Sequence, residues 1–220
     1  MDEPLMTGKR TMAYQYANRQ EAFLAKLKGK TGKISDKTHE EHLKLYTGYV
    51  NKTNAILKEL EELSKVLDPA NPAHANQIFS TIRSLKVDFT FAIGGVINHE
   101  IYFSILGGAG GPATGQVAEL IDKSFGGFEA YKKDLKATGL AARGWVWTGY
   151  DPGTGLLFNY LGDAQNTYPV WGVKPILALD TYEHAYYADF YTNRGAYLDE
   201  FMQHVDWAEV NRLLADKGSR

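Results

Sequence analysis

Residues 175–187 read Pro-Ile-Leu-Ala-Leu-Asp-Thr-Tyr-Glu-His-Ala-Tyr-Tyr, and this stretch decides how the second half of the chain folds. Its first five residues, 175–179, form a short apolar run that predicts a buried β-strand. Asp180 ends the run, and taken alone it is most simply interpreted as the N-cap of a following helix. His184 comes four residues later, one helical turn away, so both side chains can point at one place.

Two further histidines, His42 and His99, stand on helix faces that are otherwise apolar. Each is followed by apolar or aromatic residues at offsets of three, four and seven, the spacing of one helix face. Either histidine alone is more simply interpreted as a buried side chain with satisfied hydrogen bonds. The residues that share these faces are Leu45, Tyr46 and Tyr49 for His42, and Tyr102, Phe103 and Leu106 for His99.

Taken together, these four residues favour a metal site. Three imidazoles and one carboxylate would be costly to bury unpaired, and a shared cation would relieve that cost. Nitrogen and carboxylate ligands suit manganese or iron and could also suit zinc. The chain has no cysteine, which excludes disulfides, thiolate ligands and iron–sulfur clusters. From the residues alone, a metal site and four separately satisfied polar groups both stay open.

A glycine-rich linker at 107–112 divides the chain into two halves. Before it, Ser35 predicts the N-cap of a long helix ending near Val66. A second helical pattern starts with Ile78, pauses at Gly94-Gly95 and resumes through Leu106. After the linker we expect helices over about 114–124 and 127–142, a hairpin of strands 145–150 and 156–161, the strand 175–179, and further helices.

These patterns predict an α+β fold, in which an N-terminal helical hairpin packs on a C-terminal α/β domain with a small antiparallel sheet. We place the helical hairpin domain at 34–107 and the α/β domain at 113–220. Residues 1–33 form a polar, locally basic leader, expected to be solvated apart from a short helix. Its basic residues are Lys9, Arg10, Arg19, Lys26, Lys28, Lys30 and Lys33.

Composition narrows the class of protein further. The 220 residues are 44% hydrophobic and 23% charged, ordinary values for a globular protein. The net charge of −2 gives no reason to expect nucleic acid or an anionic membrane as a partner. The N-terminus lacks the apolar segment of a secretory signal, and no run is long enough to span a membrane. We therefore expect a cytoplasmic protein.

Residues 180–187 closely resemble the signature D-x-W-E-H-A-Y-Y of the iron/manganese superoxide dismutase family. Four further segments resemble motifs of that family in the family's order, and the series spans about residues 34–215. They are Tyr49-Val50-Asn51, the segment 94–99 that ends in Asn98-His99, Gly144-Trp145-Val146-Trp147, and Val205-Asp206-Trp207.

The resemblance implies a dismutase that converts superoxide to oxygen and hydrogen peroxide with one Mn or Fe ion per chain, as a homodimer or higher homo-oligomer. Metal ligands would be His42, His99, Asp180 and His184. Tyr49 would gate access and help deliver protons, and Gln165 would hold the metal-bound solvent. Trp145, Trp147 and Tyr182 would form the pocket wall. Glu183, Tyr187, Tyr46 and Arg194 would lie around the ligands or at the contact between subunits.

The chain also departs from the family pattern. His42 and Tyr49 are seven residues apart instead of eight, so a regular helix brings both to one face without a bulge. The family's relay histidine, one turn after the first ligand, is missing, and Tyr46 is the residue that could take its place. Tyr182 replaces the signature tryptophan. Gly95 occupies the position where iron-type members often carry the glutamine, whereas Gln165 resembles the manganese-type arrangement, which favours Mn.

Two other functions stay open. One is a metal-binding relative with weak or no dismutase activity, since the relay histidine and the signature tryptophan are absent. The other is a structural metalloprotein or an interaction module that uses the basic leader.

Overall fold

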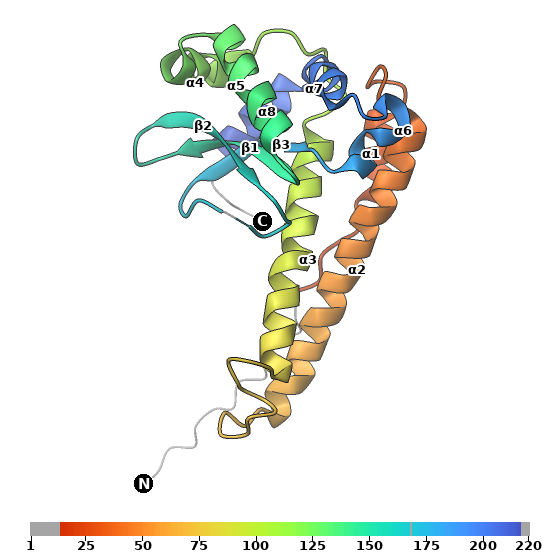
Figure 1. The fold of residues 1–220 in the computed structure, drawn as a ribbon, viewed down its shortest axis with the longest axis vertical. Coiled ribbons are helices and arrows are strands. Elements are labelled where there is room, and N and C mark those ends of the chain that lie inside the picture. The colour runs from red at the N-terminus through yellow and green to blue at the C-terminus, as the bar shows by residue number, and fades with distance from the viewer. Residues whose placement is uncertain (1–13, 168, 217–220) are drawn as a thin grey trace.

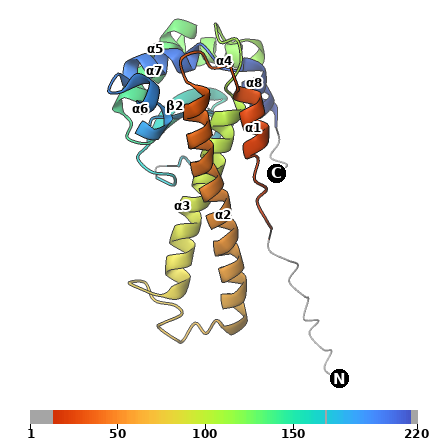
Figure 2. The same ribbon diagram turned by 90° about the vertical axis from the view of Figure 1, so that its right-hand side faces the viewer.

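The computed structural model describes residues 14–167 and 169–216. The first half is dominated by two long helices, α2 (Asp36–Val66) and α3 (Thr81–Ser104), which form a hairpin projecting from the rest of the molecule (Figures 1 and 2). The short helix α1 (Gln20–Leu27) packs beside them and buries Phe23 and Leu27. This confirms the short helix expected in the leader, while Lys9 and Arg10 lie outside the described residues.

The long helices begin where their capping residues predict. The Ser35 hydroxyl accepts a hydrogen bond from the backbone N–H of Thr38 at 3.2 Å, as the sequence predicted. The second helix starts later than expected, because Ser80 is the N-cap of α3 and Ile78 lies in the preceding loop, 84% exposed. The predicted pause at Gly94-Gly95 is wrong, since α3 runs through both glycines without interruption.

The second half packs helices around a three-stranded sheet. Helices α4 (Gly115–Phe125) and α5 (Phe128–Ala141) precede strands β1 (Trp145–Asp151), β2 (Leu156–Gly162) and β3 (Lys174–Asp180), and the antiparallel sheet has the order β2-β1-β3. A 3₁₀ turn (Glu183–Ala185) and helices α6 (Tyr187–Phe190), α7 (Arg194–Met202) and α8 (Trp207–Ala215) follow. The predicted α+β fold, including the β1–β2 hairpin, is confirmed.

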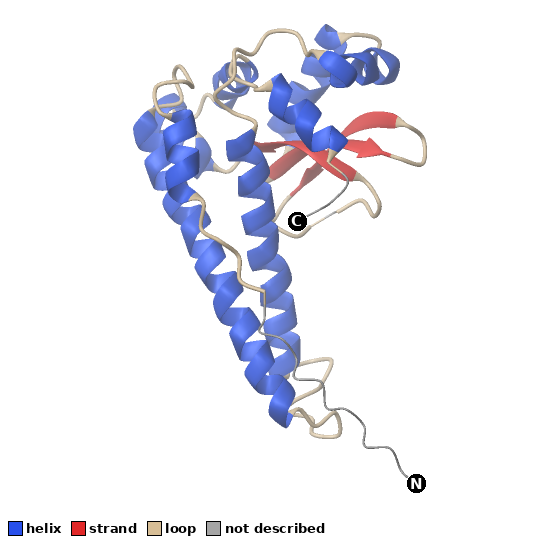
Figure 3. Cartoon of the chain, turned by 180° about the vertical axis from the view of Figure 1, so that it is seen from behind, coloured by secondary structure: helices blue, strands red, loops and turns tan. Residues whose placement is uncertain are grey.

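The core lies where the two halves meet. Figure 3 shows the sheet beside the upper part of α3, and α3 packs against β3. Trp145 pairs with Asp180 in the β1–β3 register, so the two residues lie at the same end of the sheet. Fully buried aromatic rings fill this junction, among them Tyr102, Phe103 and Trp145. Among the described residues, no helix is long and apolar enough to cross a membrane.

The first prediction concerns Gly94, where a β-carbon would collide with the Gln165 carbonyl. Gly94→Ala should lower the free energy of unfolding by about 1–3 kcal/mol, because the loop that carries Gln165 must shift. Gly195→Ala is the matched control: its β-carbon would come no closer than 3.7 Å to the Asn193 side chain. There alanine should be neutral or stabilise α7 by up to about 1 kcal/mol. Urea unfolding measures both, and equal effects would contradict the argument.

Candidate metal centre

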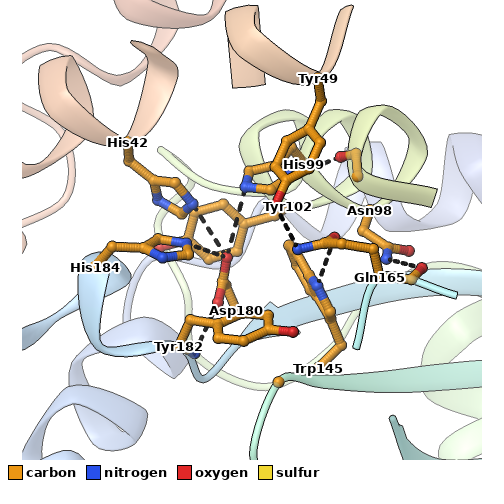
Figure 4. A network of polar contacts seen from close by, with 12 residues as sticks. His42, Tyr49, Asn98, His99, Tyr102, Trp145, Gln165, Asp180, Tyr182 and His184 are labelled. Atoms are coloured by element: carbon orange, nitrogen blue, oxygen red, sulfur yellow. Dashed lines mark hydrogen bonds and ion pairs between the residues drawn. The ribbon is translucent and has the colours of Figure 1, made fainter. Parts of the chain in front are cut away.

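Side chains from four elements of the fold converge at the junction of the two halves. His42 comes from α2, His99 from α3, Asp180 from the end of β3, and His184 from the 3₁₀ turn that follows (Figure 4). One potential ligand atom from each residue lies within 4.8 Å of all the others. The structure therefore brings together the four residues that the sequence analysis selected.

The spacing within this cluster suits a single cation. The Nε2 atoms of His42, His184 and His99 lie 3.1, 3.3 and 3.8 Å from the same carboxylate oxygen, Oδ2 of Asp180. Two atoms that each bind one ion at about 2.1 Å, at angles of about 90–120°, are themselves about 3.0–3.6 Å apart. The observed separations are close to that range.

The tautomer of His99 gives a second reason to place a cation here. Its Nδ1 lies 2.6 Å from the Gly95 backbone carbonyl and must donate there, because a carbonyl oxygen only accepts. In the neutral ring, Nε2 then carries no proton, and it has no hydrogen-bond partner among the described residues. It faces Oδ2 of Asp180, and both side chains are fully buried. Two buried acceptors facing each other are unfavourable unless a cation lies between them.

The charge states of the cluster agree with this arrangement. Burial lowers the pKa of His99 to about 3, and the neighbouring His42 adds to the effect. Burial also lowers the pKa of His42. Burial alone would raise the pKa of Asp180, but hydrogen bonds from His184 and His42 outweigh it and hold that pKa below its usual range. The neutral imidazoles of His42 and His99 beside an ionised carboxylate form a donor set suited to a metal cation.

A chain of hydrogen bonds runs beside the four side chains. Nε2 of Gln165 donates to the Tyr49 hydroxyl at 3.2 Å, and Oε1 of Gln165 accepts from the Trp145 indole at 3.0 Å. The Tyr49 ring lies 5.3 Å from the His99 ring. Helix α2 is regular from His42 to Tyr49, so the predicted absence of a bulge is confirmed. Burial raises the pKa of Tyr49, which keeps the phenol protonated at neutral pH.

The three residues expected to form a pocket wall lie at different depths. The Tyr182 ring stacks on His184 with centroids 5.4 Å apart, and the Trp145 ring meets His99 edge-on at 5.1 Å. Trp147 lies one layer further out, stacked on Trp145 at 6.5 Å. Trp145 and Tyr182 therefore contact ligand candidates directly, and Trp147 supports Trp145.

Two residues of α2 lie away from the cluster. Tyr46 is buried, and its hydroxyl donates to Glu100 at 3.0 Å and accepts from the backbone N–H of Arg19 at 3.3 Å. The expectation that Leu45 belongs to the buried face is wrong, because its side chain is 43% exposed. Offset three from His42 falls about 60° short of a full helical turn, and this places Leu45 at the rim of the packed face.

The cluster approaches the surface through His184. Its side chain is 30% exposed, whereas those of the other three residues are fully buried. A cavity of about 400 Å³ adjoins it, with Arg143, Arg194 and Glu183 among its lining residues. The Arg194 guanidinium donates to the Ala142 carbonyl at 2.7 Å, which fixes its charge there. Glu183 and Tyr187 are exposed on the same segment of chain.

Three residues of this region escaped the sequence analysis. Nδ2 of Asn98 donates to the Gln165 carbonyl at 3.1 Å, and the Tyr197 hydroxyl donates to the Asp180 carbonyl at 2.8 Å. Arg143 lines the cavity beside His184. The Asn98-His99 motif was a signal for Asn98. No local pattern marks Tyr197 or Arg143, because their contacts exist only in the folded chain.

Comparisons with known proteins agree with this fold and cluster. A family model described as iron/manganese superoxide dismutases, C-terminal domain, matches residues 113–213. The chain is 39% identical over 181 residues to an iron superoxide dismutase of Aquifex aeolicus, covering 81% of this chain and 83% of the relative. It is 32% identical over 194 residues to a manganese superoxide dismutase of Mycobacterium intracellulare, covering 86% and 87%.

The second prediction tests the proposed ligand set. His99→Ala and Asp180→Ala should each lose most of the bound metal, because each removes a buried donor that no neighbouring side chain can replace. Elemental analysis of the dialysed proteins measures the metal, and circular dichroism checks that the variants are folded. His74→Ala is the control, since His74 lies in the α2–α3 loop and accepts a hydrogen bond from Asp68. Full metal occupancy in either site variant would rule out the proposed set.

Proposed function

The chain belongs to the iron/manganese superoxide dismutase family, and we propose that it converts superoxide to oxygen and hydrogen peroxide at the junction of its two halves. The observation that carries this proposal is the buried Nε2 of His99, which has no hydrogen-bond partner among the described residues and lies 3.8 Å from Oδ2 of Asp180. A cation bound between His99 and Asp180 would explain this arrangement. The nearby phenol of Tyr49 and amide of Gln165 would serve proton transfer.

In this proposal His42, His99, Asp180 and His184 hold one ion. When bound, iron or manganese supplies a one-electron couple between its +3 and +2 states, so that two superoxide ions and two protons give one oxygen and one hydrogen peroxide. Gly95 fixes the tautomer of His99 through its carbonyl, and Tyr197 fixes the Asp180 backbone. These supports orient the ligands before the ion arrives.

Tyr49 would donate protons to the reacting anion, and Gln165 would orient its hydroxyl. Because Nε2 of Gln165 donates to the Tyr49 oxygen, the phenol proton is not used in that bond and can be given to a reacting anion. The indole N–H of Trp145 holds the other end of the amide, so Gln165 keeps a single orientation. The positive charges of Arg143 and Arg194 at the cavity beside His184 would attract the anionic substrate.

We favour manganese as the resident ion. The resemblance assigns the solvent-binding glutamine to Gln165 from the second half of the chain, and Gly95 leaves the iron-type position without a side chain. The relatives include proteins named for iron and for manganese, so the family itself does not select the ion. Elemental analysis of the purified protein, paired with a superoxide assay after loading with each metal, tests both the function and the ion. Metal-loaded protein without activity would favour a structural metalloprotein.

We also propose that the protein is a homo-oligomer in which Glu183 contacts the metal centre of a second copy, as the resemblance implies. Glu183 is exposed and precedes His184, whose side chain reaches the surface. Tyr187 is 46% exposed and would lie in the same contact. A cytoplasmic location remains a prediction of the sequence.

The third prediction concerns this contact. Glu183→Ala should weaken both the dimer and metal retention, because a partner carboxylate would orient the exposed ligand His184. Light scattering and metal analysis measure the two effects on the same sample. Glu129→Ala, which removes a carboxylate in the first turn of α5, is the control. A Glu183 variant that stays dimeric and fully metallated would contradict the proposed contact.

The fourth prediction concerns proton delivery. Tyr49→Phe should keep its metal but lose roughly tenfold to a hundredfold in turnover, at or below the usual contribution of a positioned proton donor, because water partly replaces the phenol. Stopped-flow decay of superoxide gives the rate, and metal analysis gives the occupancy. Tyr160→Phe is the control, since that ring packs on Trp147, one layer away from Trp145. Unchanged kinetics in the Tyr49 variant would remove Tyr49 from the mechanism.

A further inference from the structure

Tyr182 contacts both the ligand candidate His184 and the loop that carries Gln165. Its ring lies nearly parallel to the His184 ring, with centroids 5.4 Å apart and an interplanar angle of 15°. Its hydroxyl donates to the backbone carbonyl of Asp163 at 3.3 Å. Asp163 begins the loop 163–167, which carries Gln165. Figure 4 shows Tyr182 next to Asp180 and His184.

The other hydrogen bonds that fix this loop come from different elements. Asn98 of α3 donates to the Gln165 carbonyl at 3.1 Å, and Asn166 donates to Thr90 of α3 at 2.8 Å. Trp145 of β1 donates to the Gln165 amide oxygen. The Tyr182 hydroxyl adds a tie from the turn that carries Asp180 and His184.

The backbone around Tyr182 is shaped to admit its hydroxyl. A β-carbon at Gly144 would lie 3.0 Å from the Tyr182 oxygen and 2.8 Å from the Gly162 carbonyl. The absence of a side chain at residue 144 therefore lets the phenol reach the loop. Tyr182 is itself anchored, because its backbone N–H donates to Oδ1 of Asp180 at 2.9 Å. The side chain thus has little freedom to move independently of the ligands.

We propose that Tyr182 is a positioning residue that couples His184 to Gln165. His184 is the only one of the four ligand candidates whose side chain is exposed, so it is the one free to shift when an anion or a partner subunit arrives. When the His184 ring shifts, the Tyr182 ring stacked on it shifts too. Because the Tyr182 hydroxyl is bonded to the Asp163 carbonyl, the Gln165 loop is displaced as well. The amide that orients Tyr49 thereby responds to the ligand. This inference rests on the proposed function.

Tyr182→Phe removes the hydroxyl and keeps the ring, so it tests the role of the hydroxyl alone. The variant should keep its metal, because the stacking on His184 remains. Backbone amide exchange in residues 163–167 should become about fivefold faster in the metal-loaded protein, the effect of losing one hydrogen bond. The reduction potential of the bound metal and the pH profile of turnover should also shift, because Gln165 is less firmly placed. Hydrogen exchange with mass spectrometry and redox titration give these quantities, and Tyr160→Phe is the matched control.

The outcomes separate this inference from the proposed function. Unchanged exchange in residues 163–167 would overturn the coupling, whatever the activity. Faster exchange with an unchanged potential and pH profile would also overturn it, because the hydroxyl would then be only a structural tie. If the unsubstituted, metal-loaded protein has no superoxide activity, the proposed function fails, whereas the exchange result still tests the link between Tyr182 and the loop. Tyr182→Leu, which removes the ring as well, should in addition lose metal, and full retention would exclude orientation of His184 by the ring.

Discussion

The Asp180 carboxylate is the group on which the rest of this structure depends. It is fully buried at the end of β3, where an unpaired charge would be strongly destabilising. His42 and His184 form hydrogen bonds to one of its oxygens, His99 faces the same oxygen, and the Tyr182 backbone N–H donates to the other. The helical hairpin and the sheet are therefore joined by a polar cluster within an aromatic core. The four ligand candidates are therefore complete only where the two halves pack together.

Close packing at this junction depends on two adjacent glycines of α3, Gly94 and Gly95, which have no side chains. A β-carbon at Gly95 would overlap the Tyr49 ring, and one at Gly94 would overlap the Gln165 carbonyl. Gly95 therefore lets α2 pack closely against α3, and Gly94 does the same for the loop 163–167. Glycine usually weakens a helix interior by about 1 kcal/mol. In return, the two glycines leave room for the Tyr49 ring beside His99 and for the Gln165 loop against α3.

This pair of glycines also shows where sequence reasoning failed and why. Local propensity treats Gly94-Gly95 as a break, whereas tertiary packing decides that α3 continues. Helix starts with a capping residue, such as Ser35, could be predicted because the signal is local. The four ligand candidates could be selected because apolar periodicity marks an inward histidine and a strand end marks Asp180. Contacts such as that of Tyr197 with the Asp180 carbonyl join residues from different elements, and no local sequence pattern predicts them.

The shorter spacing in α2 shows how one deleted residue changes the chemistry available to the centre. At seven positions apart, His42 and Tyr49 share a regular helical face, so the phenol reaches Gln165 without a bulge in the helix. The same register puts Leu45 at the exposed rim and ties Tyr46 to Glu100. The regular face sets the Tyr49 ring 5.3 Å from the His99 ring, with its hydroxyl held by the Gln165 amide, and this placement supports the proposal that Tyr49 donates protons.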